Sequence, residues 1–177
     1  MLVKGIFSLS LIVLLSSSNS FCASKGFSAV QCGSDIPKAL IGQTIPNERV
    51  ALMEERYKNL GLKDLGGTEV SERLFLISWR ICGDEYVLLE ENDAVRDVLK
   101  FPPHSKDAPQ FVGACQINGL DRHDTIIAVL KREKTVENLP ATVAWRIDEK
   151  SAKFVKLDAE GLLCPASGVT TADELDR

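Results

Sequence analysis

The amino-acid sequence predicts an α+β domain, built mainly from a twisted antiparallel sheet with one N-terminal helix. Three observations carry this prediction. An apolar alternation turns back on itself at Gly83-Asp84, a second alternation runs through residues 140–148 and returns, and a single helical repeat precedes Gly61. Short turns join such runs into hairpins, so we expect a disulfide-stapled sheet of six to eight strands, either open or curled towards a barrel.

The one convincing helix is predicted from about Pro46 to Asn59. Asn47 is expected to be its N-cap, and Leu60-Gly61 to close it, because glycine favours the backbone conformation that follows a helix. Its apolar positions at helical spacing are Val50, Met53 and Tyr57. A shorter helical turn through residues 38–40 is expected upstream, after the capping signal Ser34-Asp35.

The central hairpin is predicted around a two-residue turn at Gly83 and Asp84. In that register Ile81 faces Tyr86 and Trp79 faces Leu88. Because a slip of one residue would expose the whole apolar set, the hairpin should lie against a core, where Trp145 of the second hairpin is expected to meet Trp79. That set comprises Phe75, Ile77, Trp79, Ile81, Tyr86 and Leu88.

Further strands are expected on both sides of a proline-rich loop at residues 102–109. Residues 94–101 form a third antiparallel strand, with a short helix as the alternative. The continuous apolar run at 125–130 is typical of a central strand covered on both faces. After the loop the predicted strands are 110–116, 125–130, 140–148, 153–157 and 161–164.

Three segments are expected to lie outside the sheet. Residues 24–31 are small and polar and should form a mobile arm, and residues 61–67 read as a loop. Residues 165–177 are small, polar and acidic, which is typical of a disordered tail. Residues 24–164 would then form a single globular domain, which agrees with the usual size of one core.

Residues 1–23 have the features of a secretory signal peptide, with Lys4 before a short apolar run and small polar residues after it. Cleavage is expected after Ser20 or Ala23. Lipid attachment at Cys22 is an alternative, although Phe21 fits that processing poorly. None of the asparagines begins an N-x-Ser/Thr sequon, which favours a bacterial origin. With the signal peptide, this predicts a secreted or periplasmic protein.

The charge of the chain narrows the choice of partners. The formal net charge is −4, and removal of Lys4 with the signal makes it more negative. An acidic protein gains nothing from the release of counterions from phosphate, so nucleic acid and anionic membrane are not expected partners. We expect a monomer, and a protein is the kind of partner that remains open.

If the signal is cleaved near Ala23, four cysteines remain, and an even number in an exported chain predicts two disulfides. No CxxC occurs among them, so zinc and redox chemistry have no local support. The favoured pairing is nested, Cys82 with Cys115 and Cys32 with Cys164, because Cys82 lies at a hairpin tip and Cys115 ends the next long strand. The two other pairings stay open.

Motifs for catalysis are weak, so an enzyme is not the leading expectation. A small secreted hydrolase that uses His123 with Asp121 or Asp124 is the alternative, but no G-x-S-x-G setting accompanies it. Glu90 and Glu91 are interpreted as a solvated turn rather than as a glycosidase carboxylate pair. No spaced metal-ligand or phosphate-loop motif occurs, so no metal and no cofactor are expected.

The sequence favours a non-enzymatic exported module that binds or inhibits a partner. The proline-rich loop supplies the candidate binding residues, because a rigid loop of mixed chemistry is suited to recognition. These candidates are Phe101, His104, Lys106 and Phe111. A structural envelope component is a third hypothesis, and it differs from the first in lacking a discrete ligand.

Overall fold

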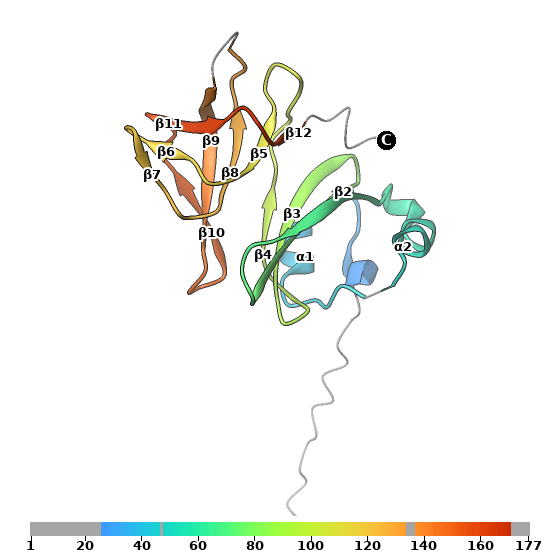
Figure 1. The fold of residues 1–177 in the computed structure, drawn as a ribbon. Helices are drawn as coiled ribbons and strands as arrows, with labels where there is room; N and C mark the ends of the chain where they lie inside the picture. Colours follow the sequence, from blue (N-terminus) through green and yellow to red (C-terminus); the bar gives the residue numbers. More distant parts are fainter. Residues whose placement is uncertain (1–25, 47, 134–136, 171–177) are drawn as a thin grey trace, which may run out of the picture.

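The computed structural model describes residues 26–46, 48–133 and 137–170, and it confirms the α+β class with antiparallel sheets. Its layers are visible in Figure 1: the N-terminal helical segments cover one face of a first sheet, and a second, curled sheet lies beyond the other face. The helical elements are η1 (Gly26–Ala29), α1 (Ile36–Leu40), α2 (Val50–Arg56) and η2 (Lys58–Leu60).

The described residues hold twelve strands, more than the six to eight expected, because three two-residue strands extend the second sheet and β1 forms where a loop was expected. The first sheet contains β1 (Lys63–Glu69), β2 (Leu74–Ile81), β3 (Asp84–Glu91) and β4 (Ala94–Lys100), in that spatial order. The second contains β5 (Gln110–Gly113), β6 (Gln116–Ile117), β7 (Leu120–Asp121), β8 (Ile126–Leu130), β9 (Asn138–Asp148), β10 (Lys153–Leu157), β11 (Leu162–Pro165) and β12 (Val169–Thr170).

The β2–β3 hairpin is present, but its predicted register is wrong by two residues. Ile81 pairs with Asp84, so the turn residues are Cys82 and Gly83, both with positive φ (56° and 87°). Two positive φ values are what a primed two-residue turn requires. Since a shift of two residues keeps every side chain on its face, the apolar set still points to the same side. Trp79 consequently lies opposite Tyr86.

Both faces of this hairpin are buried, whereas the sequence pattern indicated one. The face that carries Trp79 packs against the N-terminal segment. On the other face, Leu74, Leu76, Val87 and Leu89 pack against side chains of the second sheet. Within the predicted apolar set, Phe75 is the exception, because 43% of its surface is exposed.

The N-terminal segment contributes directly to the core. Phe27 is fully buried and its ring meets Trp79 edge-on, with 5.1 Å between centroids. The expectation of a mobile arm is therefore wrong for residues 26–31. Residues 63–67 form part of β1, so the expected loop at 61–67 is wrong there too, because edge pairing with β2 overrides the glycines.

The helices follow their local signals in part. Asp35 caps α1 as expected, its side chain accepting the Lys38 amide at 3.1 Å. The helix predicted over Pro46–Asn59 is shorter, since α2 ends at Arg56 and a separate turn, η2, follows. Asn47, its expected cap, lies outside the described residues.

The second sheet follows the order β12-β5-β8-β9-β11-β6-β7, and β10 also pairs with β9. It curls into a half-barrel, on the left of Figure 1. Every residue of β8 is buried, alternate side chains entering two cores, which confirms the central strand. The tail is not disordered from residue 165, because β12 pairs with β5; residues 171–177 lie outside the described residues.

The predicted meeting of the two tryptophans is wrong. Trp79 lies in the core beneath the N-terminal segment, whereas Trp145 packs between the two sheets, 6.2 Å from the ring of Phe101. The difference follows from the two-sided burial of the first sheet, which separates the molecule into layers.

The four cysteines form two disulfides, but the nested pairing is wrong: Cys32 bonds Cys82, and Cys115 bonds Cys164. The N-terminal segment lies against the hairpin that carries Cys82, and β11 returns to pair with β6, next to Cys115. Two disulfides are compatible with an oxidising compartment. In the part of the chain that the structure describes, no helix is long and apolar enough to cross a membrane.

Removal of either disulfide is expected to lower the free energy of unfolding by about 3–5 kcal/mol, because each bond closes a long loop in the unfolded chain. The double variants Cys32→Ala/Cys82→Ala and Cys115→Ala/Cys164→Ala can be compared directly with each other, because the bonds that they remove span 50 and 49 residues. Urea unfolding measures both effects. Peptide mapping without reduction that found Cys82 joined to Cys115 would contradict the connectivity.

Candidate functional site

The structure separates the four candidate binding residues of the proline-rich region. Phe101 is buried between the two sheets, and its ring contacts His104 edge-on at 5.7 Å. Phe111 is buried in the core of the second sheet, and Lys106 is exposed. Phe101 and His104 are therefore together, while Phe111 and Lys106 do not share a surface with them.

His104 forms an enclosed pair with Glu85. Its Nε2 lies 2.9 Å from Oε2 of Glu85, and the two side chains are only 3% and 9% exposed. This pair ties the proline-rich loop to β3. It borders a pocket of about 430 Å³ whose lining residues include Arg80 and Lys100 but no serine, threonine or cysteine.

The carboxylates beside His123 are engaged elsewhere. Asp121 accepts a hydrogen bond from the side-chain amide of Gln116 at 2.9 Å. Asp124 forms an ion pair with Arg122. Each acid thus contacts a neighbour other than His123.

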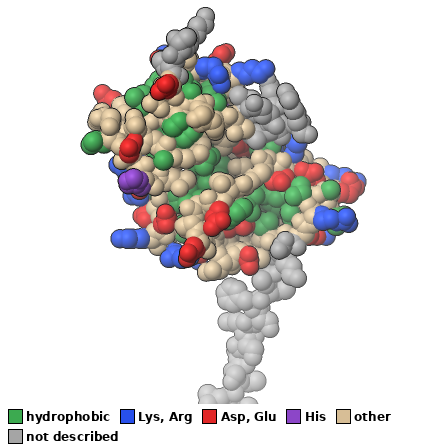
Figure 2. Space-filling model, viewed as in Figure 1, with side chains coloured by type: hydrophobic (Ala, Val, Ile, Leu, Met, Phe, Trp, Pro, Cys, Tyr) green, Lys and Arg blue, Asp and Glu red, His purple; other side chains and the backbone are tan. Residues whose placement is uncertain are grey.

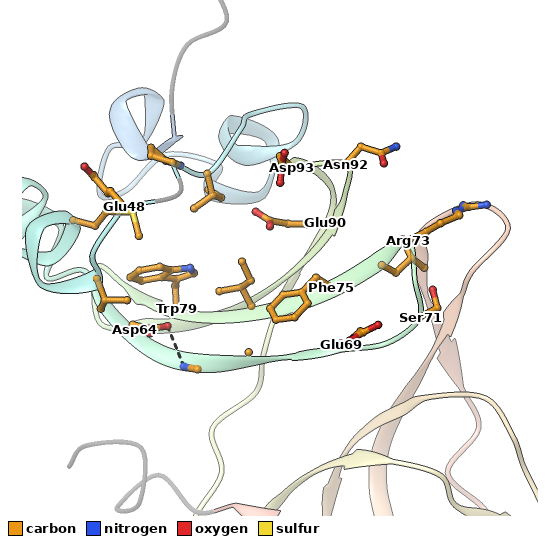
Figure 3. A pocket seen from close by; sticks show the side chains of 18 of the residues that line it. Glu48, Asp64, Glu69, Ser71, Arg73, Phe75, Trp79, Glu90, Asn92 and Asp93 are labelled. Atoms are coloured by element: carbon orange, nitrogen blue, oxygen red, sulfur yellow. Dashed lines mark hydrogen bonds between the residues drawn. The ribbon is translucent and has the colours of Figure 1, made fainter.

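A larger groove lies on the outer face of the first sheet, between the segment that leads into α2 and the β3–β4 turn (Figure 3). Its volume is about 810 Å³. Figure 2 shows, over this side of the molecule, exposed hydrophobic side chains bordered by acidic ones. We call it the acidic-aromatic groove; the residues used below are Glu69, Phe75, Ile77, Trp79, Glu90 and Asp93.

Strand register builds the floor of this groove. Phe75 on β2 lies directly opposite Glu69 on β1 and opposite Glu90 on β3. Side chains that face each other across antiparallel strands have Cβ atoms about 5 Å apart. Because Phe75 is 43% exposed, an aromatic ring lies open to solvent between two carboxylates.

Gly67 allows the ring of Phe75 to lie low over β1. A Cβ atom at position 67 would come within 2.9 Å of Cε1 of Phe75 and 2.6 Å of the carbonyl oxygen of Leu76. Any larger residue would have to displace the ring or the strand. The position of the exposed ring therefore depends on the absence of a side chain there.

Two polar atoms at the groove are buried and have no hydrogen-bond partner within the described residues. They are Nε1 of Trp79 and Oε1 of Glu90. Trp79 is 2% exposed, and Figure 3 shows its indole nitrogen directed towards the middle of the groove. Since an unpaired buried polar atom costs about 1–3 kcal/mol, a ligand that pairs with these atoms would gain affinity.

The electrostatic character of the groove is acidic. Its charged lining residues are Glu48, Asp64, Glu69, Glu72, Arg73, Glu90 and Asp93. Glu48 is held by Arg56 through two hydrogen bonds, at 2.6 and 2.9 Å. Burial, with a smaller contribution from Asp93, raises the pKa of Glu90 to about 7. Glu90 therefore changes charge near neutral pH.

No family model, no curated protein and no solved structure matches this chain. The site therefore rests on its own geometry. Across residues 26–46, 48–133 and 137–170, no group of three histidine, cysteine, aspartate or glutamate side chains converges to hold a metal ion.

Sequence reasoning missed this site because of the hairpin register. With the turn placed at Gly83-Asp84, Phe75 would face Asn92, whereas the observed turn brings it opposite Glu90. Glu90 was expected in a solvated turn; it is part of β3 and one of its oxygens is buried. The signal that could have found the site is Glu90, which lies as far from the Cys82-Gly83 turn on β3 as Phe75 does on β2.

Glu90→Gln is expected to stabilise the protein at pH 8 and to have little effect at pH 4. The pKa of Glu90 is raised from 4.5 to about 7, so the folded state holds this proton more tightly than the unfolded chain. That contribution to stability is fully present below about pH 4.5 and is lost as the pH rises through about 7. Because the group is partly exposed, the gain at pH 8 should be about 1–2 kcal/mol.

Urea unfolding between pH 4 and 8 measures this difference. The matched control is Glu160→Gln, an exposed glutamate in the other half of the molecule, which should leave the pH dependence as in the wild type. An E90Q protein less stable than the wild type at pH 8 would contradict the assignment.

Proposed function

We propose that this protein is a non-enzymatic, exported binding module that recognises cationic groups in the acidic-aromatic groove. The observation that carries the proposal is the row formed by Glu69, Phe75 and Glu90, an exposed ring between two acids. Two disulfides and the signal-like N-terminus support the exported setting.

The chemistry of the row favours a cation over other ligands. The face of an aromatic ring attracts a cation with about 0.5–1 kcal/mol at exposed sites. Carboxylates on both sides add ion pairs, each worth about 0–1 kcal/mol where solvent is near. A lone cation should thus bind weakly, with a dissociation constant of about 1 mM or above, and higher affinity requires further contacts.

The competing hypotheses lack a comparable arrangement. For the hydrolase, Asp121 contacts Gln116 and Asp124 contacts Arg122, so neither acid is dedicated to orienting His123. An envelope component would not need an exposed aromatic ring between acids. An inhibitory role is one form of the proposed binding activity, since a groove that captures a basic side chain can occlude it.

The cation site is tested by titrating the oxidised protein with N-acetyl-lysine methylamide and following the Trp79 indole signal by NMR. We expect a saturable shift with this cation and none with the neutral norleucine analogue. Phe75→Leu removes the aromatic face and should weaken binding about two- to fivefold. Glu69→Gln should weaken it by a similar factor.

Glu160→Gln serves as the control of matched chemistry and should bind as the wild type does. Affinity should also rise between pH 6 and 8 as Glu90 ionises, and E90Q should lose this rise. Equal binding of the norleucine analogue, or unchanged affinity in both groove variants, would refute a cation site.

A further inference from the structure

The edge of the first sheet is open beside the acidic-aromatic groove. In the described chain, β1 pairs with β2 on one side only. Its first half is covered by α2, where the amide of Asp64 donates to Glu54 at 2.9 Å. Its second half, residues 66–69, is exposed. An exposed edge strand is a template for pairing with another chain.

The ladder sets which backbone groups face that edge. The amide of Val70 donates to the carbonyl of Leu74, which makes these two residues a hydrogen-bonded pair. Pairs alternate along an antiparallel ladder, so Thr68 also bonds towards β2. The amide and carbonyl groups of Gly67 and Glu69 therefore point outwards, away from β2.

A second pocket, of about 370 Å³, lies on the opposite face of this edge, between the two sheets. Gly66, Gly67 and Glu69 line both this pocket and the acidic-aromatic groove. The other residues that line the second pocket are uncharged and include Thr68, Val112 and Gln110. A strand added to β1 would place alternate side chains in an acidic groove and in a pocket whose only charged lining residue is Glu69, at their shared edge.

We propose that the partner is an extended polypeptide segment, with basic residues at alternate positions and uncharged residues between them, which adds to β1 as an antiparallel strand. Main-chain hydrogen bonds would supply affinity and the two pockets specificity. The inference rests on the proposed cation site. Antiparallel addition continues the pairing of every strand in this sheet. A second copy of β1 fits poorly, because it would add its own Glu69 to an acidic groove.

The pairing geometry makes a specific prediction about the peptide backbone. In an antiparallel pair, the peptide residues directly opposite Gly67 and Glu69 exchange hydrogen bonds with them and place their side chains on the groove face. These are the basic residues. Methylation of their amides should therefore block binding, whereas methylation of the uncharged residues' amides should not.

The test uses a seven-residue peptide of alternating valine and lysine, acetylated and amidated, titrated calorimetrically into the oxidised full chain. We expect it to bind at least about tenfold more tightly than N-acetyl-lysine methylamide. Methylation of the three lysine amides should weaken binding about tenfold or more, and methylation of three valine amides less than twofold. Replacement of lysine by glutamate should abolish binding, and Glu160→Gln should leave it unchanged.

The outcomes separate the two proposals. If the small cation binds but the two methylated peptides bind equally, strand addition is refuted and the cation site stands. A larger loss from valine methylation would refute the antiparallel arrangement. If neither cation nor peptide binds, the proposed function fails as well. Sedimentation that detects a dimer which the peptide does not dissociate would assign the edge to a second copy of the chain.

Discussion

The whole structure depends on one constraint, which is that the β2–β3 hairpin must be buried on both faces. Its two apolar surfaces need two separate covers, and the N-terminal segment and the second sheet supply them. The first cover ends short of the β1–β2 turn: Trp79 and Leu88 lie beneath it, but Phe75 does not. The acidic-aromatic groove is the part of this face that the N-terminal cover leaves open.

The fold class could be predicted from the sequence because it depends on local patterns. The run at β8 has apolar side chains for both faces, and alternation in β2 and β9 identifies strands whatever their partners. The hairpin register could not be predicted with equal success. Gly83-Asp84 is a favourable local turn, but the observed turn puts Cys82 in a conformation that a cysteine rarely adopts, and Cys82 is held there by its bond to Cys32.

Features that depend on distant parts of the chain were beyond sequence reasoning. Phe27 belongs to a segment that looks polar, and only the hydrophobic surface around Trp79 gives it a place in the core. The disulfide pairing depends in the same way on where β11 returns. The candidate site depends on three such features together. Phe75 must pair with Glu90, Gly67 must leave room for the ring of Phe75, and α2 must end before it covers the second half of β1.

The two disulfides close separate loops that follow one another along the chain, rather than one loop within the other. Each loop belongs to a different sheet, and the only covalent path between them is residues 83–114. Under mechanical tension applied to its two ends, the protein would therefore behave as two cross-linked units in series. Residues 83–114, which contain β3, β4 and β5, could extend, while the 50- and 49-residue loops would stay closed. Force would therefore detach β3 from β2 and β5 from β8, whereas strands inside a closed loop would be shielded from it.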